Sequence, residues 1–301
     1  MPDNRLICNL LEKLSPSCRV ILTGDANQLP SIEPGVVFKQ LLAAEAIMSL
    51  RLSQVFRQKV TSDILRLAHD IVQYKDGDPP VLLSDYSGDV EFIKCKTEHE
   101  TYAAVERIVR SLLNSGKSPD DIQVLSPIKN KLLGIQSLNK PLANLINVSR
   151  MAQKDNWSGF FVGDKVIQGS NLYENDTMSV YNGAIGRVTR IVPNRKELYV
   201  DFPDSGEIRY DDQTIEKLEL AYALTIHKFQ GSEAPYIILP MDSAFHRMLN
   251  KQLLYTAVTR AKAKLFIIGD EGSFREAVQR DALEKRSSYL ADRMDSAMFA
   301  A

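Results

Sequence analysis

The hydrophobic positions of the first hundred residues alternate between helical and strand-like spacing. The apolar run 19–23 ends in Gly24 and Asp25, which is typical of a buried parallel strand that delivers a loop. On either side of it, apolar residues recur every three or four positions, and Ser-Pro-Ser at 15–17 interrupts the first stretch. Helices are therefore predicted over residues 4–14, 34–48 and 61–74, the last of them capped by Thr61 or Ser62.

The same alternation continues further along the chain. Strands are predicted at residues 90–94, 122–125, 236–239 and 265–268, and helices at residues 98–115, 132–147, 252–262 and 273–285. Strands that alternate with helices indicate a doubly wound α/β fold around a parallel sheet. After Arg286 the pattern is weak, and we expect this tail to fray.

Residues 162–220 follow a different pattern. Turn signals such as Tyr181-Asn182-Gly183 separate short apolar stretches, and strands are predicted at residues 162–168, 186–191, 198–201, 207–210 and 217–220. So many short strands in about sixty residues indicate a small antiparallel barrel inserted into the α/β domain.

Composition narrows the class of protein. A chain of 301 residues corresponds to about two domains, and 44% hydrophobic with 25% charged residues excludes collagen-like, fibrous and disordered chains. The 37 basic and 38 acidic residues give a net charge of −1, so the totals do not indicate a strongly basic nucleic-acid protein. The totals do not exclude a local cluster of basic residues that contacts nucleic acid.

Cysteines, apolar runs and histidines bear on the cellular compartment and on metal binding. Three scattered cysteines do not form a disulfide framework or a zinc knuckle, and they favour a reducing compartment. The N-terminal stretch lacks the long apolar run of a signal peptide, and no segment approaches the ~18 apolar residues of a membrane span. We therefore expect a soluble, cytoplasmic protein with no membrane partner. None of the four histidines lies in a metal-ligand pattern, so no metal site is predicted.

Two pairs of residues have types that suit phosphate chemistry. Asp25 and Gln28 lie where a predicted parallel strand ends, and a carboxylate beside an amide suits metal-bound water and a phosphate oxygen. Arg57 and Arg260 carry guanidinium groups, which stabilise the charge on a transferred phosphoryl group. The plainer alternatives are an ordinary turn held by Asp25 and surface salt bridges for the two arginines. Residue types alone favour these alternatives.

The run from Thr225 to Glu233 (TIHKFQGSE) is dense in polar donors. At a junction between a strand and a helix, its hydroxyls and backbone N–H groups can bind the phosphates of a nucleic acid. The alternative is an N-capped helix that ends at Gly231, in which His227 is a core or cap residue.

The run Gly116-Lys117-Ser118 imitates the end of a phosphate-binding loop. The pattern G-x-x-x-x-G-K-[ST] requires glycine at position 111, where the chain has Ser111. The run also follows a predicted helix and precedes a strand, which reverses the required order. We therefore predict that Gly116 is the C-cap glycine of the preceding helix, and that the chain lacks a complete nucleoside-triphosphate site.

Taken together, these segments resemble the superfamily-1 helicases of the RecD/TraA branch. Residues 24–35 (GDANQLPSIEPG) look like motif III, residues 53–58 (SQVFRQ) like motif IV, residues 223–233 (ALTIHKFQGSE) like motif V and residues 254–262 (LYTAVTRAK) like motif VI. Residues 163–167 (GDKVI) and 181–186 (YNGAIG) resemble the SH3-like insertion of that branch. The resemblance covers nearly the whole chain, and the order and spacing of the segments make chance agreement improbable.

The resemblance implies catalytic roles for three residues. Gln28 would sense the γ-phosphate and couple hydrolysis to strand movement, with Asp25 near the magnesium-bound water. Arg57 and Arg260 would reach the γ-phosphate from a second RecA-like domain.

It also implies roles for the run 225–233. Gly231 and Glu233 would lie beside the nucleotide sugar. Thr225, His227 and Lys228 would touch the backbone of single-stranded DNA.

The resemblance further implies an α/β fold. It would comprise a RecA-like parallel-sheet domain of the P-loop NTPase type with an inserted SH3-like β-barrel, plus the remnant of a first RecA-like domain. Residues 1–52 would be that remnant, residues 53–161 and 221–301 would form the second RecA-like domain, and residues 162–220 would form the barrel.

The phosphate loop (motif I) and the acidic pair (motif II) of the family are absent from the sequence. We therefore expect the C-terminal part of an ATP-dependent 5′–3′ DNA helicase, inactive by itself. It would use ATP and Mg²⁺, bind single-stranded DNA and work with other recombination or repair subunits. Phe229 replaces a small polar residue of the family, and either base stacking or burial would suit it. The alternatives are a non-catalytic nucleic-acid or protein-binding module and an RNA-directed helicase.

Overall fold

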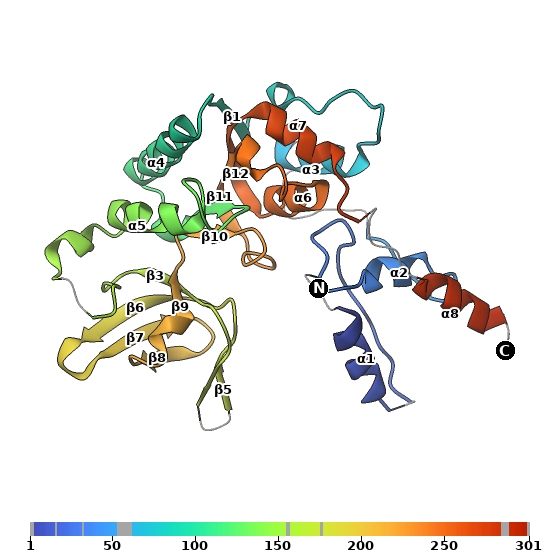
Figure 1. Ribbon diagram of the computed structural model, residues 1–301, viewed down its shortest axis with the longest axis horizontal. Helices are drawn as coiled ribbons and strands as arrows, with labels where there is room; N and C mark the ends of the chain where they lie inside the picture. The colour runs from blue at the N-terminus through green and yellow to red at the C-terminus, as the bar shows by residue number, and fades with distance from the viewer. Residues whose placement is uncertain are drawn as a thin grey trace.

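The computed structural model describes residues 3–15, 17–31, 33–52, 62–154, 157–174, 177–283 and 289–299. A parallel sheet with helices on both faces forms the upper part of the molecule in Figure 1. An antiparallel sheet lies below it, and an N-terminal segment lies beside the C-terminal helix. The predicted alternation of α/β and all-β segments is therefore confirmed in outline.

The parallel sheet has five strands in the order β1-β12-β11-β2-β10. All of its pairings are parallel. The strands are β1 (Val90–Lys94), β2 (Ile122–Ser126), β10 (Ala223–Thr225), β11 (Ala234–Met241) and β12 (Ala261–Gly269). The order differs from the chain order, as expected of a doubly wound sheet.

Two hydrophobic cores cover the two faces of this sheet. Successive residues of a strand point to opposite faces, and accordingly Ile237 belongs to one core and Ile238 to the other. The first core packs against α3 (Asp63–Gln73), α6 (Lys251–Val258) and α7 (Glu271–Gln279), and the second against α4 (Glu98–Asn114) and α5 (Ile135–Ile146).

Capping residues mark the start of α3 and the end of α4 at the positions that the sequence predicted. Ser62 accepts a hydrogen bond from Leu65 N and caps α3. Gly116 has φ +78°, and the N–H groups of Gly116 and Lys117 donate to the carbonyls of Leu113 and Leu112. This is the hydrogen-bond pattern of a helix C-cap, so the predicted role of Gly116 is confirmed.

A side chain forms hydrogen bonds with the outer edge of β10, which is an edge strand of the sheet. Asn139 on α5 donates through Nδ2 to Ala223 O at 2.9 Å and accepts from Ala223 N at 2.8 Å. The amide group therefore replaces a neighbouring strand, which satisfies two buried backbone groups at the edge of the sheet.

The antiparallel sheet has the order β8-β7-β6-β3-β9. Its strands are β3 (Lys165–Gln168), β6 (Ile185–Val192), β7 (Glu197–Phe202), β8 (Gly206–Tyr210) and β9 (Leu218–Leu220). A two-stranded ribbon of β4 (Leu172–Glu174) and β5 (Thr177–Val180), which was not predicted, projects from this sheet in Figure 1. Because β8 and β9 are the two edges in the described pairings, closure into a barrel stays a prediction.

Six short 3-10 helices complete the described structure: Leu83–Asp85, Pro119–Asp121, Val148–Ala152, Pro193–Arg195, Ile215–Lys217 and Ser243–Phe245. Within the described residues, no helix combines the length and the apolar character needed to cross a bilayer.

A buried polar network joins the two sheets. The fully buried carboxylate of Asp164 accepts hydrogen bonds from Arg150 Nη1 (2.5 Å), Asn147 Nδ2 (2.9 Å), Phe161 N (2.9 Å) and Tyr222 OH (3.3 Å). The guanidinium of Arg150 balances the carboxylate charge, so the burial of this ion is compensated.

Lys165, at the start of β3, is a further buried ionisable residue at the same junction. It is 8% exposed, and its Nζ donates to Gln123 Oε1 at 3.2 Å. Burial lowers the pKa of Lys165 to about 8. The carboxylates of Asp120 and Asp121 act in the opposite direction, and the guanidinium of Arg187 lowers this pKa further.

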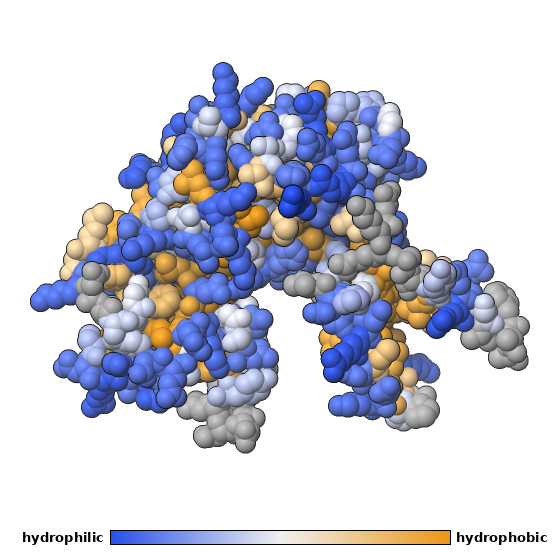
Figure 2. Space-filling model, viewed as in Figure 1, coloured by the Kyte–Doolittle hydropathy of each residue, from blue (hydrophilic) through white to orange (hydrophobic). Residues whose placement is uncertain are grey.

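The N-terminal segment contains α1 (Asn4–Glu12) and α2 (Val37–Ala43). The strand predicted at residues 19–23 is wrong, because this stretch is extended but unpaired, and Ile21 is 87% exposed. A strand needs neighbouring strands to pair its backbone groups, and no strand among the described residues lies beside it. Figure 2 shows apolar side chains at the surface of this part of the molecule.

Other predicted boundaries were also wrong. The helix expected at 34–48 is shorter, the helix expected at 252–262 ends at Val258, and the following residues enter β12. The helix expected at 273–285 corresponds to α7, which ends at Gln279.

The tail contains α8 (Leu290–Phe299). It is held beside α2 by Ala46 N, which donates to Asp295 Oδ1 at 2.9 Å, so tertiary contact orders a segment of weak pattern.

Candidate functional site

The loop 25–31 holds the amide of Gln28 through an aspartate. Asp25 Oδ1 accepts from Asn27 N at 2.9 Å, and Asp25 Oδ2 accepts from Gln28 Nε2 at 3.2 Å. The plainer sequence interpretation, a turn held by Asp25, therefore describes the local geometry correctly. The same hydrogen bonds also orient the Gln28 side chain, so both interpretations of this loop remain compatible with the structure.

Helix α6 contacts this loop, although more than 200 residues separate them. Tyr255 OH donates to Asp25 Oδ2 at 2.9 Å, and Leu29 N donates to Thr256 Oγ1 at 2.9 Å. Leu29 is 4% exposed and belongs to the first core of the parallel-sheet unit. The loop is thus anchored by a buried apolar side chain and by two hydrogen bonds to successive residues of one helix.

The hydroxyl of Tyr255 lies in an electrostatically mixed environment. Its pKa is raised by burial and by the neighbouring carboxylate of Asp25, whereas Arg260 and Arg51 lower it. Tyr255 therefore stays protonated and acts as the donor to Asp25.

Arg260 follows α6 closely and is 5% exposed. Its Nε donates to Thr256 O at 3.1 Å, its Nη1 to Ser232 O at 3.1 Å, and its Nη2 to Thr259 Oγ1 at 3.2 Å. These three hydrogen bonds join the guanidinium to carbonyl and hydroxyl oxygens of its own sheet unit. Because Arg260 is buried, the surface position assumed in the salt-bridge alternative is wrong.

The residues expected beside the nucleotide sugar lie next to Arg260. Glu233 forms an ion pair with Lys262, and Ala234 N donates to Arg260 O at 3.0 Å. Gly231 has φ +84°, and a Cβ at this position would meet no atom within 4 Å. The backbone conformation, not crowding, therefore favours glycine here.

Residues 226–231 form turns, not the N-capped helix considered from the sequence. Thr225 is 7% exposed, and its hydroxyl oxygen accepts from Lys228 N at 3.2 Å, so this side chain supports the turn from inside. His227 is half-buried, and burial lowers its pKa. Phe229 is 3% exposed and part of the first core, so burial is the correct alternative for this ring.

The structure brings together some of the predicted site residues and not others. Asp25 and Gln28 share a loop that is hydrogen-bonded to α6, and Arg260 donates to Thr256 O of the same helix. Thr225 ends β10, and His227 and Lys228 lie in the turn that follows it. Arg57 lies outside the described residues, so its predicted role is untested.

Sequence reasoning missed Tyr255, Thr256 and Gln230, which connect these segments. Gln230 Nε2 donates to Leu29 O at 3.4 Å. Polar residues inside the apolar helix 251–258 were the available signal, but nothing in the sequence indicated their partners.

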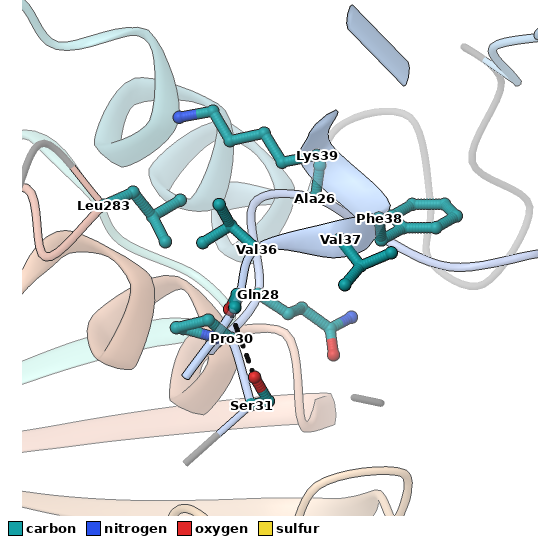
Figure 3. Close-up of a pocket in the computed structure, with 10 residues that line it drawn as sticks. Ala26, Gln28, Pro30, Ser31, Val36, Val37, Phe38, Lys39 and Leu283 are labelled. Atoms are coloured by element: carbon teal, nitrogen blue, oxygen red, sulfur yellow. Dashed lines mark hydrogen bonds between the residues drawn. The ribbon is translucent and has the colours of Figure 1, made fainter. Parts of the chain in front are cut away.

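A pocket borders the same loop, as Figure 3 shows. Gln28 and Pro30 form one side, and Leu283 approaches from the C-terminal segment. Ser31 lies at its rim and donates to Glu33 O at 2.8 Å and to Gly35 O at 3.2 Å, the contact drawn as a dashed line. The remaining lining residues are mainly apolar: Ala26, Gly35, Val36, Val37, Phe38 and Lys39.

The hydrogen-bond donors near α6 suit the phosphates of a nucleoside triphosphate. An amide at Gln28 and a guanidinium at Arg260 match the acceptor oxygens of a phosphate. The sequence has no G-x-x-x-x-G-K-[ST] loop to cradle the phosphates. Among the described residues, no three His, Cys, Asp or Glu side chains are grouped as metal ligands.

Family models match two parts of the chain. The UvrD-like helicase C-terminal domain matches residues 220–268, and an AAA domain matches residues 1–97.

Relatives match nearly the whole chain. The ATP-dependent RecD2 DNA helicase of Deinococcus radiodurans is 31% identical over 98% of this chain and 38% of its own length. The RecBCD enzyme subunit RecD of Mycobacterium tuberculosis is 28% identical over 97% of this chain and 51% of its own length. The conjugal transfer protein TraA of Agrobacterium fabrum is 26% identical over 82% of this chain and 22% of its own length. The chain thus spans about half or less of each of these relatives.

A solved structure of Pif1 helicase from Bacteroides in complex with ADP-AlF3 and ssDNA is also similar. It is 19% identical, with 84% of this chain and 57% of that chain covered and a TM-score of 0.39. The motifs and the relatives together show that the chain belongs to the RecD-like branch of the superfamily-1 helicases.

Proposed function

We propose that this chain is part of an ATP-dependent DNA helicase of the RecD type, in which ATP hydrolysis drives 5′-to-3′ translocation on single-stranded DNA. The observation that best supports the proposal is the contact between loop 25–31 and α6. The loop carries Gln28, whose amide donates to Asp25, and it is hydrogen-bonded to Tyr255 and Thr256 of α6. Arg260 donates to Thr256 O, so a glutamine and an arginine, residue types that act on transferred phosphoryl groups, are both joined to one helix.

In this proposal, Gln28 acts on the phosphates from the first RecA-like domain, and Arg57 and Arg260 act on them from the second. ATP supplies the transferred phosphoryl group, and Mg²⁺ neutralises charge on its oxygens. Arg260 now donates to the carbonyls of Ser232 and Thr256. It would exchange some of these neutral acceptors for a phosphate oxygen, which forms stronger, charge-assisted hydrogen bonds.

The nucleic acid would follow the turn after β10. His227 and Lys228 are the candidate contacts, with Thr225 supporting the turn from inside. Phosphate contacts from such residues position a strand without reading its sequence. Gly231 and Glu233 would lie on the nucleotide side of the same loop.

The domain assignment belongs to the same proposal. Residues 1–52 would complete a first RecA-like domain, residues 53–161 and 221–301 would form the second, and the antiparallel unit at 162–220 would be an SH3-like barrel. Other recombination or repair subunits would be partners of the complete helicase.

The test compares this chain with the complete protein. We expect the chain by itself to show no DNA-stimulated ATPase, because it has no phosphate loop. In the complete protein, Gln28→Ala and Arg260→Ala should abolish DNA-stimulated ATPase and leave strand binding nearly unchanged. Robust turnover by the isolated chain, lost on Arg260→Ala, would contradict the proposed incompleteness. Normal turnover by both variants of the complete protein would contradict the site.

Strand binding is tested with fluorescently labelled oligonucleotides at low salt. We expect weak binding that falls steeply with salt, because contacts to phosphates release counterions. Equal or tighter binding of an RNA strand would favour an RNA-directed helicase. Absence of any binding would contradict the nucleic-acid contacts and favour a non-catalytic protein-binding module.

A further inference from the structure

Lys228, a candidate strand contact, is paired with a carboxylate from the other sheet. Its Nζ lies 2.7 Å from Glu219 Oε1 on β9. The side chain of Lys228 is 20% exposed and that of Glu219 is 44% exposed. The ammonium group is thus largely enclosed, whereas the carboxylate keeps ready access to water.

Both members of this pair are held by ordered backbone. Lys228 N donates to Thr225 Oγ1, and Thr225 ends β10 in the parallel sheet. Glu219 is opposite Ile167 in the register of β3 and β9. A Cβ on Gly169 would come within 3.3 Å of Glu219 Oε1, so the backbone passes close to the carboxylate. The ion pair is therefore a fixed bridge between the two sheets.

A phosphodiester and a carboxylate compete for the same ammonium. Each is an anionic acceptor, so exchanging one for the other keeps the charge of Lys228 compensated. The released carboxylate loses little, because the Glu219 side chain is 44% exposed and water solvates its charge. It would remain close to the incoming phosphate, however, and would repel it.

We propose that Glu219 is an electrostatic competitor at the nucleic-acid interface: it neutralises Lys228 in the free protein and is displaced by a phosphodiester of the bound strand. This inference rests on the proposed function, in which the turn 225–231 faces single-stranded nucleic acid. Its consequence is a weaker and less salt-dependent hold on the strand at this point, as a protein that must repeatedly release the backbone requires.

The experiment measures binding of a labelled single-stranded oligothymidylate to the 301-residue chain by fluorescence anisotropy at several salt concentrations. Glu219→Gln keeps the size of the side chain and removes the competing charge. We expect the Kd to fall about two- to fivefold, which is the fold-change of an exposed ion pair. The slope of log K against log salt should steepen by about 0.7, the value for one further phosphate contact on a single strand.

A matched control separates this local effect from the change in net charge. Glu91→Gln removes the same charge from a comparable ion pair, Lys264 Nζ to Glu91 Oε2 at 2.7 Å, with side chains 32% and 43% exposed. The control should leave the Kd and the salt slope close to those of the wild type. In the Glu219→Gln background, Lys228→Gln should remove the gain, because the freed ammonium produces it.

The outcomes separate the inference from the function on which it rests. Wild-type binding that Glu219→Gln leaves unchanged or weakens would overturn the inference and leave the strand interface standing. An equal gain from Glu91→Gln, or a gain that survives Lys228→Gln, would also overturn it. No binding by the wild type or any variant, with normal circular dichroism spectra, would overturn both.

Discussion

Replacing Lys165 by methionine tests whether the junction between the two sheets contains a destabilising buried charge. Lys165 is 8% exposed, and its Nζ donates to Gln123 Oε1. Burial lowers its pKa from 10.5 to about 8. The folded protein therefore binds this proton less tightly than the unfolded chain, so the stability contributed by this site rises with pH between about 8 and 10.5.

The magnitude follows from these two pKa values. At pH 7 the lysine is charged in both states, and its burial costs about 3 kcal/mol relative to a neutral side chain. At pH 9.5 most of the folded molecules hold a neutral lysine, and the cost falls to about 1 kcal/mol. Methionine is neutral at every pH and similar in length. The stability of Lys165→Met minus that of the wild type should therefore fall by about 2 kcal/mol from pH 7 to pH 9.5.

The pH dependence of this difference is the useful quantity, not its value at one pH. Methionine leaves Gln123 Oε1 without its donor, and that loss is independent of pH. Above pH 10 the tyrosines of the unfolded chain ionise, whereas burial raises the pKa of folded Tyr222 and Tyr210. Ending the series at pH 9.5 avoids this second titration.

The assay is urea unfolding followed by tryptophan fluorescence. Trp157 is the only tryptophan of the chain and packs against the core of the antiparallel sheet that contains Lys165. Lys140→Met, at an exposed position on α5, is the control and should differ from the wild type by the same amount at every pH. A difference for Lys165→Met that stays constant or grows with pH would refute the reasoning.

Three further outcomes are expected from single substitutions. Asn139→Ala leaves the N–H and C=O groups of Ala223 unpaired at a buried sheet edge and should lower the free energy of unfolding by about 2–4 kcal/mol in urea; a loss below 1 kcal/mol would show that the edge is satisfied in another way. Tyr255→Phe removes the donor to Asp25, worth about 1 kcal/mol, so amide hydrogen exchange in the attached loop should accelerate about fivefold; unchanged exchange would mean that the loop is held without this bond. Gly116→Ala places a Cβ on a residue with φ +78° in open space and should lower thermal stability by about 1 kcal/mol through backbone strain alone; a neutral result would contradict its role as the C-cap.

The sequence indicated some residues of the candidate site, and only the tertiary structure showed how they are connected. Sequence patterns indicated Asp25, Gln28 and Arg260 separately, because residue types and spacing are local properties. They did not indicate that Tyr255 and Thr256 bind the loop 25–31, because that contact joins segments more than 200 residues apart. The sequence also did not indicate that Arg260 is buried, because burial depends on the segments that pack around a side chain.

By itself the sequence determined what depends on neighbouring residues: the alternation of helices and strands, the cap at Ser62 and the left-handed Gly116. Tertiary structure alone decided which segments acquired partners. The apolar run 19–23 stays unpaired although its pattern is that of a strand, and the weakly patterned tail forms α8 beside α2. The physical reason is that a backbone hydrogen bond or a buried side chain needs a partner in space, and the residues that supply it are often distant in the chain.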